Sequence, residues 1–373
     1  MHLETIKVVG VMSGSSLDGL DLALCEFRID KSNENQPIHA WQLLNHETIP
    51  LPSQWKILLK DLVNGNSLSL AQADFDFGYF IGNSVKDFLQ KHNQSADIIA
   101  SHGHTIFHYP ENKMTYQIGN GGAINTSSGM TTINDFRSTD IGLGGQGTPL
   151  APTAEKILFE GYDFYLNIGG IANITAKIGQ KFIAFDSTPA NQVLNGLAQR
   201  LGSEYDEDGK IARSGDLNDE LFRGLSLYPY FKLKYPKSLD NDWITKNFLQ
   251  NILMHEGNTQ DKLRTATEFI GYQIAQSINQ IMSTEGLSQI GCKMMVSGGG
   301  AYNTFLLECI RKNMVSVATV EIQIPSPAII EFKEAILVAL LGTLRLYNLT
   351  NCLSSVTGAS RDSIGGAIYQ GLK

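Results

Sequence analysis

The sequence predicts an α/β protein of two lobes, each a mixed sheet covered by helices. Two glycine-bearing turns carry this prediction, because Gly10–Asp21 and Leu166–Asn173 each stand between apolar, strand-like runs. In both, the returning run alternates with a period of two. The length of 373 residues also exceeds what one hydrophobic core usually supports. We therefore expect one lobe over residues 1–135, joined by a C-terminal helix at about 350–373, and a second lobe with insertions over residues 136–349.

Strand patterns come first in each half and helical patterns follow, which is the order of a sheet covered by its own helices. Alternation predicts strands at 5–12, 20–29 and 38–48, then helices at 52–64 and 68–92 and a strand at 98–101. The second half repeats this order, with strands at 164–168, 171–178 and 182–186 and a helix at 189–201. The remaining predicted elements are a strand at 293–297 and helices at 262–283, 302–313 and 331–348.

The composition excludes several classes of function. A net charge of −8 argues against duplex nucleic acid, which favours a basic surface. The four cysteines are scattered without a CxxC pair, so we expect no zinc site and no disulfide, and a reducing cytoplasm fits. The longest apolar run, Ala335–Leu341, is too short for a membrane span, and the first residues lack the pattern of a signal peptide. We expect a cytoplasmic protein without membrane or nucleic-acid partners.

The glycine turns are suited to phosphate. Glycine allows positive φ and lets an anion approach the backbone N–H groups. A third segment, Gly298–Gly300, ends a buried-type strand and opens into a helix, whose N-terminus also attracts anions. This triple glycine fits a simple strand-to-helix turn equally well. Because the first two turns would face one phosphate chain from two lobes, the sequence favours an ATP-handling enzyme.

Six segments, in order along nearly the whole chain, resemble the anhydro-N-acetylmuramic acid kinase family: Gly10–Asp21, Asp135–Arg137, Gly144–Pro149, Leu166–Asn173, Ser297–Gly300 and Ser355–Ser360. The resemblance implies a two-lobed actin-like ATPase fold that closes over ATP in a cleft between the lobes. It also implies a double reaction in peptidoglycan recycling. Water opens the 1,6-anhydro ring, and the freed O6 takes the γ-phosphate of ATP to give N-acetylmuramic acid 6-phosphate. The implied ligands are ATP, Mg²⁺ and a small anhydro sugar, and the implied assembly is a homodimer.

The resemblance implies two catalytic carboxylates. Asp186 matches the aspartate of the family's Asp-Thr-Gly-Pro pattern and would be the general base that takes a proton from water. An aspartate before a helix is also a common helix cap, which is the alternative role. Glu334 matches a glutamate of the family and would help to hold the sugar or the water. Its alternative role is that of an acidic residue in the first turn of a helix, which the helix dipole favours.

Three glycine segments are expected to bind the nucleotide. The expected residues are Gly14, Ser15, Ser16, Leu17, Asp18, Gly19, Leu20, Asp21, Gly169, Gly170, Gly298, Gly299 and Gly300. Asp18 would face Mg²⁺ through water, or would be an ordinary turn residue before Gly19. The second turn would face the phosphates from the other lobe, and the triple glycine would border the adenosine.

On the sugar side, Arg137 is a candidate partner for the lactyl carboxylate, because a guanidinium group suits bidentate pairing. A surface salt bridge is its alternative role. The other expected substrate-binding residues are His102, Gln146 and Gly147. His102 stands close in sequence to His104 and His108, but their spacing suits no standard zinc site.

The chain departs from the family pattern mainly on the sugar side. Ser187-Thr188 replaces Thr-Gly and His104 replaces glutamine. Pro236–Trp243, which contains the divergent residues 239–242, stands where the family commonly has Lys-Ser-Thr-Gly-Arg-Glu. A kinase of another anhydro sugar, of the levoglucosan type, is therefore one alternative. A chaperone-like or actin-like ATPase is an alternative of a different class, because a fold does not fix a function.

Overall fold

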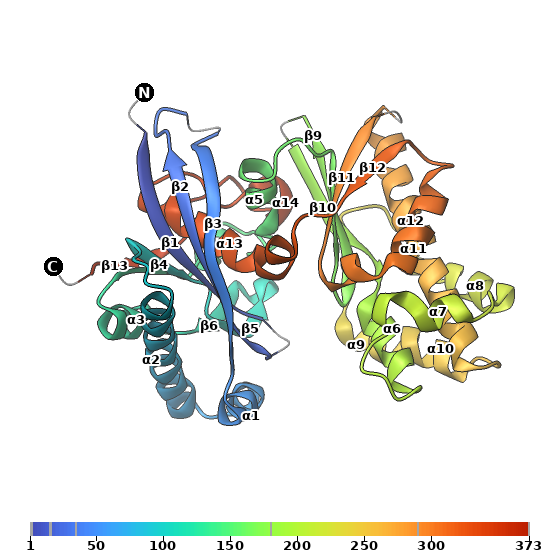
Figure 1. Cartoon of the computed structure of the whole chain (residues 1–373), viewed down its shortest axis with the longest axis horizontal. Coiled ribbons are helices and arrows are strands. Elements are labelled where there is room, and N and C mark those ends of the chain that lie inside the picture. The colour runs from blue at the N-terminus through green and yellow to red at the C-terminus, as the bar shows by residue number, and fades with distance from the viewer. Residues whose placement is uncertain (1–2, 15–16, 34–35, 180, 289–290, 372–373) are drawn as a thin grey trace. The chain divides into compact units, whose positions relative to one another are not determined.

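The computed structural model describes residues 3–14, 17–33, 36–179, 181–288 and 291–371 (Figure 1). The chain divides into two compact units, unit 1 (Met1–Glu160 with Glu331–Lys373) and unit 2 (Gly161–Ile330). Each unit is a mixed sheet covered by helices, which confirms the predicted fold class. Among the described residues, no helix combines the length and the apolar content needed to span a membrane.

Unit 1 is built on a six-stranded sheet in the order β13-β7-β4-β1-β2-β3, with a separate β5-β6 hairpin. β1, β4 and β7 are parallel, whereas β2, β3 and β13 are antiparallel to their neighbours. The strands are β1 (Glu4–Ser13), β2 (Gly19–Ile29), β3 (Ile38–Pro50), β4 (Ile98–Ser101), β5 (His104–Tyr109), β6 (Met114–Ile118), β7 (Thr131–Asn134) and β13 (Ala367–Tyr369). The helices are α1 (Ser53–Asp61), α2 (Ser67–Lys91), α3 (Gly121–Ser128), α4 (Ser138–Gly142), α5 (Ala151–Ile157), most of α13 (Pro327–Leu346) and α14 (Ser354–Thr357).

Different helices cover the two faces of this sheet. Side chains alternate along β1, so neighbouring residues of the strand face different helices. Val9 and Val11 lie in an apolar core that they share with Phe77 of α2. Gly10, between them, faces the other way, and a Cβ atom there would lie only 1.9 Å from the carbonyl oxygen of Ala335 in α13. Only glycine allows α13 to approach the strand this closely, so this motif glycine is required by packing.

Unit 2 contains a five-stranded sheet in the order β10-β9-β8-β11-β12. Its strands are β8 (Phe164–Ile168), β9 (Ile171–Ile178), β10 (Lys181–Pro189), β11 (Cys292–Ser297) and β12 (Val320–Gln323). Its helices are α6 (Asn191–Gln199), α7 (Lys210–Ser214), α8 (Asp219–Ser226), α9 (Asn241–Trp243), α10 (Gln250–Met254), α11 (Thr259–Glu285) and α12 (Thr304–Met314). The apolar side chains of α11, among them Phe269 and Ile274, join those of β8 and β11 in one core.

The two sheets repeat one topology. In unit 1, β1 forms an antiparallel meander with β2 and β3, and β4 and β7 extend the sheet in parallel from the other side of β1. In unit 2, β8 forms the same meander with β9 and β10, and β11 and β12 extend it in parallel. The duplication inferred from two similar turns therefore extends to five strands of each unit.

The unit boundaries differ from those expected at residues 135 and 349. α4 and α5 belong to unit 1, and α13 belongs there from residue 331 because it packs closely on β1. The expected C-terminal helix at 350–373 is wrong. In the described part of that stretch only α14 is helical, and β13 pairs antiparallel with β7. Gly358 (φ +78°) and Gly366 (φ +118°) adopt left-handed backbone, which interrupts a helix.

Candidate active site

The carboxyl ends of parallel strands meet at one edge of a sheet, and open α/β sheets bind ligands there. In unit 1 this edge carries Ser13 at the end of β1 and the residues that follow β4 and β7. Ser13 Oγ lies 3.1 Å from His104 Nδ1, and this hydrogen bond ties the turn after β4 to β1. His102 and Arg137 follow β4 and β7 at the same edge, so the topology collects them from distant parts of the chain.

Arg137 is a half-buried cation with an unfilled hydrogen-bonding position. Burial lowers its pKa to about 10, although the charge of Glu334 acts in the opposite direction. Its Nε is buried and has no hydrogen-bond partner among the described residues, so it is not the surface residue of the alternative. A buried polar group without a partner costs about 1–3 kcal/mol. Gly147 stands beside Arg137, since a Cβ atom on Gly147 would lie 3.4 Å from Arg137 Cβ. The arrangement suits an anionic ligand.

His102 is a neutral hydrogen-bond acceptor. Its Nδ1 lies 3.1 Å from the carbonyl oxygen of Gly103, which can only accept, so Nδ1 carries the proton. Burial, together with the charge of Arg137, lowers the pKa of His102 to about 3, and the imidazole is therefore neutral near pH 7. Nε2 is then an acceptor, and it is buried without a partner in the described part of the chain.

Carboxylates from β2 and α13 lie close enough to influence one another. Burial raises the pKa of Asp21, and the negative charges of Asp18 and Glu331 raise it further. Burial and the charge of Asp21 likewise raise the pKa of Glu334, against the opposing charge of Arg137, although the Glu334 side chain remains accessible. These acids repel one another, and a cation bound nearby would relieve that repulsion.

The carboxylates of this edge fit Mg²⁺ only through bound water. No cluster of three or more acidic, histidine or cysteine side chains among the described residues could hold a metal ion directly. Mg²⁺ usually keeps several waters and binds through one or two carboxylates and substrate phosphates. The accessible carboxylate of Asp18, with Asp21 nearby, fits this mode of binding.

Glu334 is not in a first turn. α13 begins at Pro327, so Glu334 lies about two turns into the helix. The helix dipole acts mainly within the first turn. The alternative role predicted for Glu334 is therefore wrong.

Gln146 and Gly147 are held by a buried carboxylate that the sequence analysis missed. Asp140 Oδ2 accepts a hydrogen bond from the Gly147 N–H at 2.7 Å, and Oδ1 accepts one from Thr357 Oγ1 at 2.7 Å. The Gln146 N–H donates to the carbonyl oxygen of Thr357 at 2.9 Å. The segments 144–149 and 355–360 thus form one structural group, which leaves the Gln146 side chain exposed.

The first glycine turn uses its leucines for the core. Leu17 and Leu20 are buried in the apolar core of unit 1, so only their backbone is available to a ligand. Gly19 begins β2, where a Cβ atom would lie 2.6 Å from the carbonyl oxygen of Ile49. Strand pairing therefore requires glycine there. The other expected residues of this turn are Ser15 and Ser16, which lie outside the described residues, and Gly14 and Asp18, which flank them.

In unit 2 the second and third glycine segments come together at the carboxyl ends of the parallel strands β8 and β11. Cβ atoms on Gly169, Gly170 and Gly299 would meet no atom of the described residues closer than 3.5 Å. The packing of the protein therefore does not explain glycine at these three positions. The open backbone there fits the close approach of a bulky anion.

The other two glycines of the third segment are explained by the fold. Gly298 has a φ of +81°, which side chains rarely adopt. A Cβ atom on Gly300 would lie 2.2 Å from Ile168 Cγ2. The strand-to-helix turn therefore explains Gly298 and Gly300, and nucleotide binding stays a prediction for Gly299.

Asp186 lies inside β10, beside a bulge between Asp186 and Thr188. α6 begins at Asn191, its N-cap is Ala190, and no side chain in the described part of the chain caps it. The helix-cap alternative for Asp186 is therefore wrong. Burial raises the pKa of Asp186, while the hydrogen bond from the Leu239 N–H acts in the opposite direction.

The segment between α8 and α9 holds Asp186 through three hydrogen bonds. The Leu239 N–H donates to Asp186 Oδ2 at 2.8 Å, and the Asp186 N–H donates to the carbonyl oxygen of Lys237 at 3.1 Å. The Tyr230 hydroxyl donates to the carbonyl oxygen of Asp186 at 2.6 Å. Among the described residues, Asp186 Oδ1 has no hydrogen bond. One carboxylate oxygen is thus fixed and the other is available to a ligand.

Lys237, whose backbone carbonyl accepts from the Asp186 N–H, carries a positive group that the sequence analysis did not single out. Its Nζ lies 4.8 Å from the ring centre of Tyr230 and 5.7 Å from that of Phe185. Burial lowers the pKa of Lys237. Lys237 and Leu239, which contact Asp186, both belong to Pro236–Trp243, the segment that departs from the family pattern. That departure was the sequence signal that could have drawn attention to Lys237.

Relatives of this protein match it along its whole length. A family model for anhydro-N-acetylmuramic acid kinase matches residues 6–371. Proteins named anhydro-N-acetylmuramic acid kinase from Aliivibrio fischeri and Hydrogenovibrio crunogenus are 34% and 33% identical to the chain. Both matches cover 97% of this chain, and they cover 99% and 97% of the relatives. The structure of (R)-2-hydroxyglutaryl-CoA dehydratase component A from Acidaminococcus fermentans matches with a TM-score of 0.42 and 12% identity, over 90% of this chain and 96% of that chain.

Proposed function

The chain belongs to the anhydro-N-acetylmuramic acid kinase family, and we propose that it converts 1,6-anhydro-N-acetylmuramic acid and ATP to N-acetylmuramic acid 6-phosphate and ADP. Water adds to C1, the bond between C1 and O6 breaks, and O6 takes the γ-phosphoryl group. Such a product belongs to the recycling of peptidoglycan fragments. The comparisons give no support to a levoglucosan-type kinase or a chaperone-like ATPase.

The single observation that carries this proposal is the way Asp186 is held. A general base needs a fixed position and a free oxygen within hydrogen-bond reach of the proton that it abstracts. The Leu239 N–H fixes Oδ2, and Oδ1 is free to accept from the water that attacks C1. Because burial raises the pKa of Asp186, it is a stronger base than an exposed aspartate. The proton then passes to solvent after each turnover.

The sugar-binding roles fall to residues of unit 1. Arg137 offers a half-buried guanidinium group whose buried Nε lacks a partner among the described residues, and the lactyl carboxylate of the sugar would supply a charge-assisted hydrogen bond. Glu334, whose charge interacts with Arg137, would hold a sugar hydroxyl or the attacking water. His102 and the loop of Gln146 and Gly147 border Arg137 and would complete the contacts.

Phosphoryl transfer depends on positioning and charge neutralisation. We assign the phosphates to the open backbone at Gly169, Gly170 and Gly299, and to the turn over residues 14–21. Asp18 would hold Mg²⁺ through water, and Mg²⁺ would neutralise charge on the phosphate oxygens. The adenosine would border Gly298–Gly300.

Turnover of 1,6-anhydro-N-acetylmuramic acid with ATP tests the proposal. ADP release is followed in heavy-oxygen water, and the product is weighed by mass spectrometry, with levoglucosan and the ring-opened sugar as comparison substrates. A product with one phosphate and one solvent oxygen supports both steps. Phosphorylation without solvent oxygen would contradict the hydrolytic step. Turnover of levoglucosan alone would identify a neutral anhydro sugar as the substrate.

A further inference from the structure

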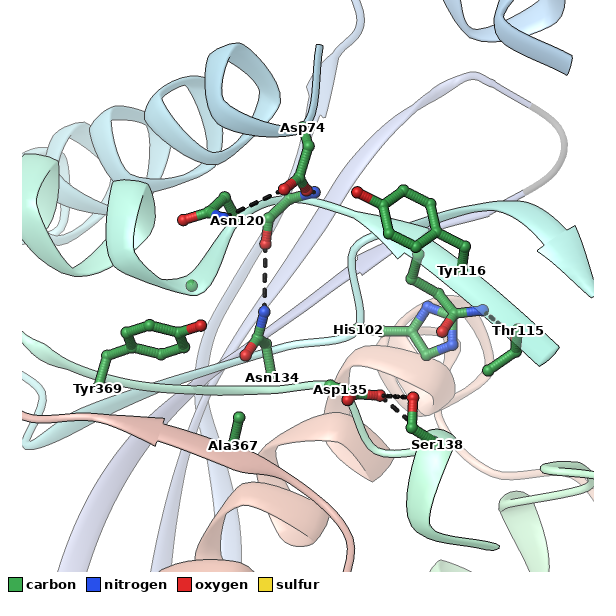
Figure 2. Close-up of a pocket in the computed structure, with 13 residues that line it drawn as sticks. Asp74, His102, Thr115, Tyr116, Asn120, Asn134, Asp135, Ser138, Ala367 and Tyr369 are labelled. Atoms are coloured by element: carbon green, nitrogen blue, oxygen red, sulfur yellow. Dashed lines mark hydrogen bonds between the residues drawn. The ribbon is translucent and has the colours of Figure 1, made fainter. Parts of the chain in front are cut away.

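Unit 1 contains a pocket in which only one lining residue, His102, has a role proposed above (Figure 2). Its volume is about 210 Å³, or roughly seven times the share of one water in the liquid. It lies between α2, β6, the start of α3, the end of β7 and β13. Its lining includes Asp74, His102, Tyr116, Asn134, Asp135 and Tyr369.

Two buried acceptor atoms belong to residues that line this pocket, and both lack partners. His102 donates from Nδ1, which leaves Nε2 as an acceptor without a partner among the described residues. Asn134 donates from Nδ2 to the carbonyl oxygen of Gly119 at 3.4 Å, and its Oδ1 is buried without a partner in the same described part of the chain. Leaving such atoms unsatisfied costs about 1–3 kcal/mol each. A ligand that presents hydrogen-bond donors would remove this cost.

The charge of the pocket selects against anions. Asp74 and Asp135 contribute two carboxylates, and the described residues that line the pocket include no lysine or arginine. Asp74 is already fixed, because it accepts hydrogen bonds from the Gly119 N–H at 2.8 Å and from Asn120 Nδ2 at 3.1 Å. A phosphate or a free carboxylate would therefore be repelled by Asp74 and Asp135, and the only opposing charge that reaches the described lining is that of Arg137 at His102. A neutral group with hydroxyl or amide donors fits.

Two tyrosines stand on opposite sides of the pocket (Figure 2). The Tyr369 ring lies against Gly121, where a Cβ atom would approach it to 2.3 Å. Glycine at this position makes room for the ring. Burial, with the charge of Asp74, raises the pKa of Tyr116, so its hydroxyl keeps the proton. Aromatic walls with a few fixed polar groups are typical of sites for small molecules.

We propose that this pocket binds an uncharged sugar group, which donates hydrogen bonds from hydroxyl or amide groups to His102 Nε2 and Asn134 Oδ1. The proposal rests on the proposed function only in the choice of a sugar as ligand. Asp135 and Ser138, which line the pocket, flank Arg137 in the sequence. The sugar group is either the uncharged side of the phosphorylated sugar or part of a separate sugar molecule.

Calorimetric titration of the intact protein without ATP tests this inference. The probes are N-acetylglucosamine, which is neutral and carries hydroxyl and amide donors, and inorganic phosphate. Asn134→Ala removes the acceptor and should weaken binding of N-acetylglucosamine about tenfold. Asn134→Asp keeps an acceptor oxygen and should retain affinity within about threefold. Gln72→Ala, an exposed change on α2 outside the pocket, should have no effect.

A second variant keeps the test decisive if Asn134→Ala fails to fold. Tyr116→Phe keeps the ring and should weaken binding by about two- to fivefold. Saturating 1,6-anhydro-N-acetylmuramic acid distinguishes the two sources of the ligand. Displacement of N-acetylglucosamine by it assigns the pocket to the phosphorylated sugar, whereas simultaneous binding assigns it to a separate one.

The inference is overturned if the wild type binds neither sugar, or if the pocket variants match the wild type for both. Phosphate binding that Asn134→Ala abolishes would also overturn it. The turnover assay remains separate. A wild type that binds N-acetylglucosamine through Asn134 but does not phosphorylate the anhydro sugar would preserve the pocket and refute the proposed reaction.

Discussion

Replacement of Asp186 by asparagine isolates its chemistry from its structural contacts. The amide oxygen of asparagine can still accept from the Leu239 N–H, which donates to Asp186 Oδ2 at 2.8 Å. The two backbone hydrogen bonds, to Lys237 and from Tyr230, do not involve the side chain at all. The variant should therefore fold and lose only the base. Loss of a general base lowers the rate about 10²–10⁴-fold, which corresponds to about 2.7–5.4 kcal/mol in the activation free energy.

The assay is sugar-dependent ADP release, with ATP affinity measured separately by calorimetry. Asp186→Asn should bind ATP like the wild type and lose kcat. Asp163→Asn is the matched control in the same unit, because Asp163 Oδ2 also accepts from a backbone N–H, that of Lys293, at 2.8 Å. It should retain the wild-type kcat.

The reasoning is refuted if Asp186→Asn turns over within about tenfold of the wild type, because positioning alone would then explain the carboxylate. It is refuted equally if both Asp→Asn variants lose activity to the same degree. That result would mean that aspartates binding the backbone of unit 2 act through folding.

The other predictions concern the sugar, the nucleotide and pH. Arg137→Ala should lower kcat/KM about 10–100-fold more for the carboxylate-bearing sugar than for a neutral one. Arg213→Ala, a change at an exposed arginine, should leave kcat/KM unchanged for both sugars. Equal losses on both sugars in Arg137→Ala would contradict the role assigned to Arg137. Gly299→Ala should raise the KM for ATP without changing thermal unfolding, whereas Gly300→Ala should destabilise unit 2 by about 1–3 kcal/mol in denaturant. Unchanged ATP kinetics in Gly299→Ala would indicate that no phosphate lies there. Burial raises the pKa of Asp186 above 3.8, and the base must be deprotonated to act. In the wild type, kcat/KM should therefore fall as the pH falls through the pKa of Asp186. This acidic decrease in kcat/KM should be absent in Asp186→Asn.

Strands with regular alternation were predicted well. The runs expected at 5–12 and 20–29 are β1 (Glu4–Ser13) and β2 (Gly19–Ile29), and that expected at 171–178 is β9 (Ile171–Ile178). Their side chains are buried at alternate positions or on both faces of the sheet. Buried positions carry apolar residues, so the strands can be recognised from the apolar pattern of the sequence. Helices α2 and α11 were also predicted, because an apolar stripe marks their buried faces.

Short strands with distant partners were missed. β7 and β13 contain four and three residues, too few for a periodic pattern. β13 depends on pairing with β7, and such pairing depends on tertiary context more than on the local sequence. Because β13 was not recognised as a strand, the C-terminal segment was incorrectly predicted to be a helix. The same long-range pairing brings Tyr369 to the pocket beside Asn134, which is why that pocket could not be predicted.

The side chains of the candidate site could be proposed from the sequence, but their supports could not. The hydrogen bond that fixes Asp186 comes from the backbone N–H of Leu239, 53 residues away. Every residue except proline has such an N–H, so nothing in the sequence distinguishes this one. The buried carboxylate of Asp140 was missed for a related reason, since its partners Gly147 and Thr357 belong to segments far apart in the chain.

The structure changes the balance between catalytic and structural roles for three residues. Asp186 does not cap α6, Glu334 lies beyond the first turn of α13, and Arg137 is half-buried. Partial burial disfavours the charged forms of Arg137 and Asp186, so it reduces the stability of the folded state. A fold normally offsets such a cost with hydrogen bonds, yet Arg137 Nε has no partner among the described residues. Local rules are broken mainly at functional sites. An anion bound to Arg137 in unit 1, and a hydrogen-bond donor bound to Asp186 in unit 2, would each account for a cost that the described fold leaves uncompensated.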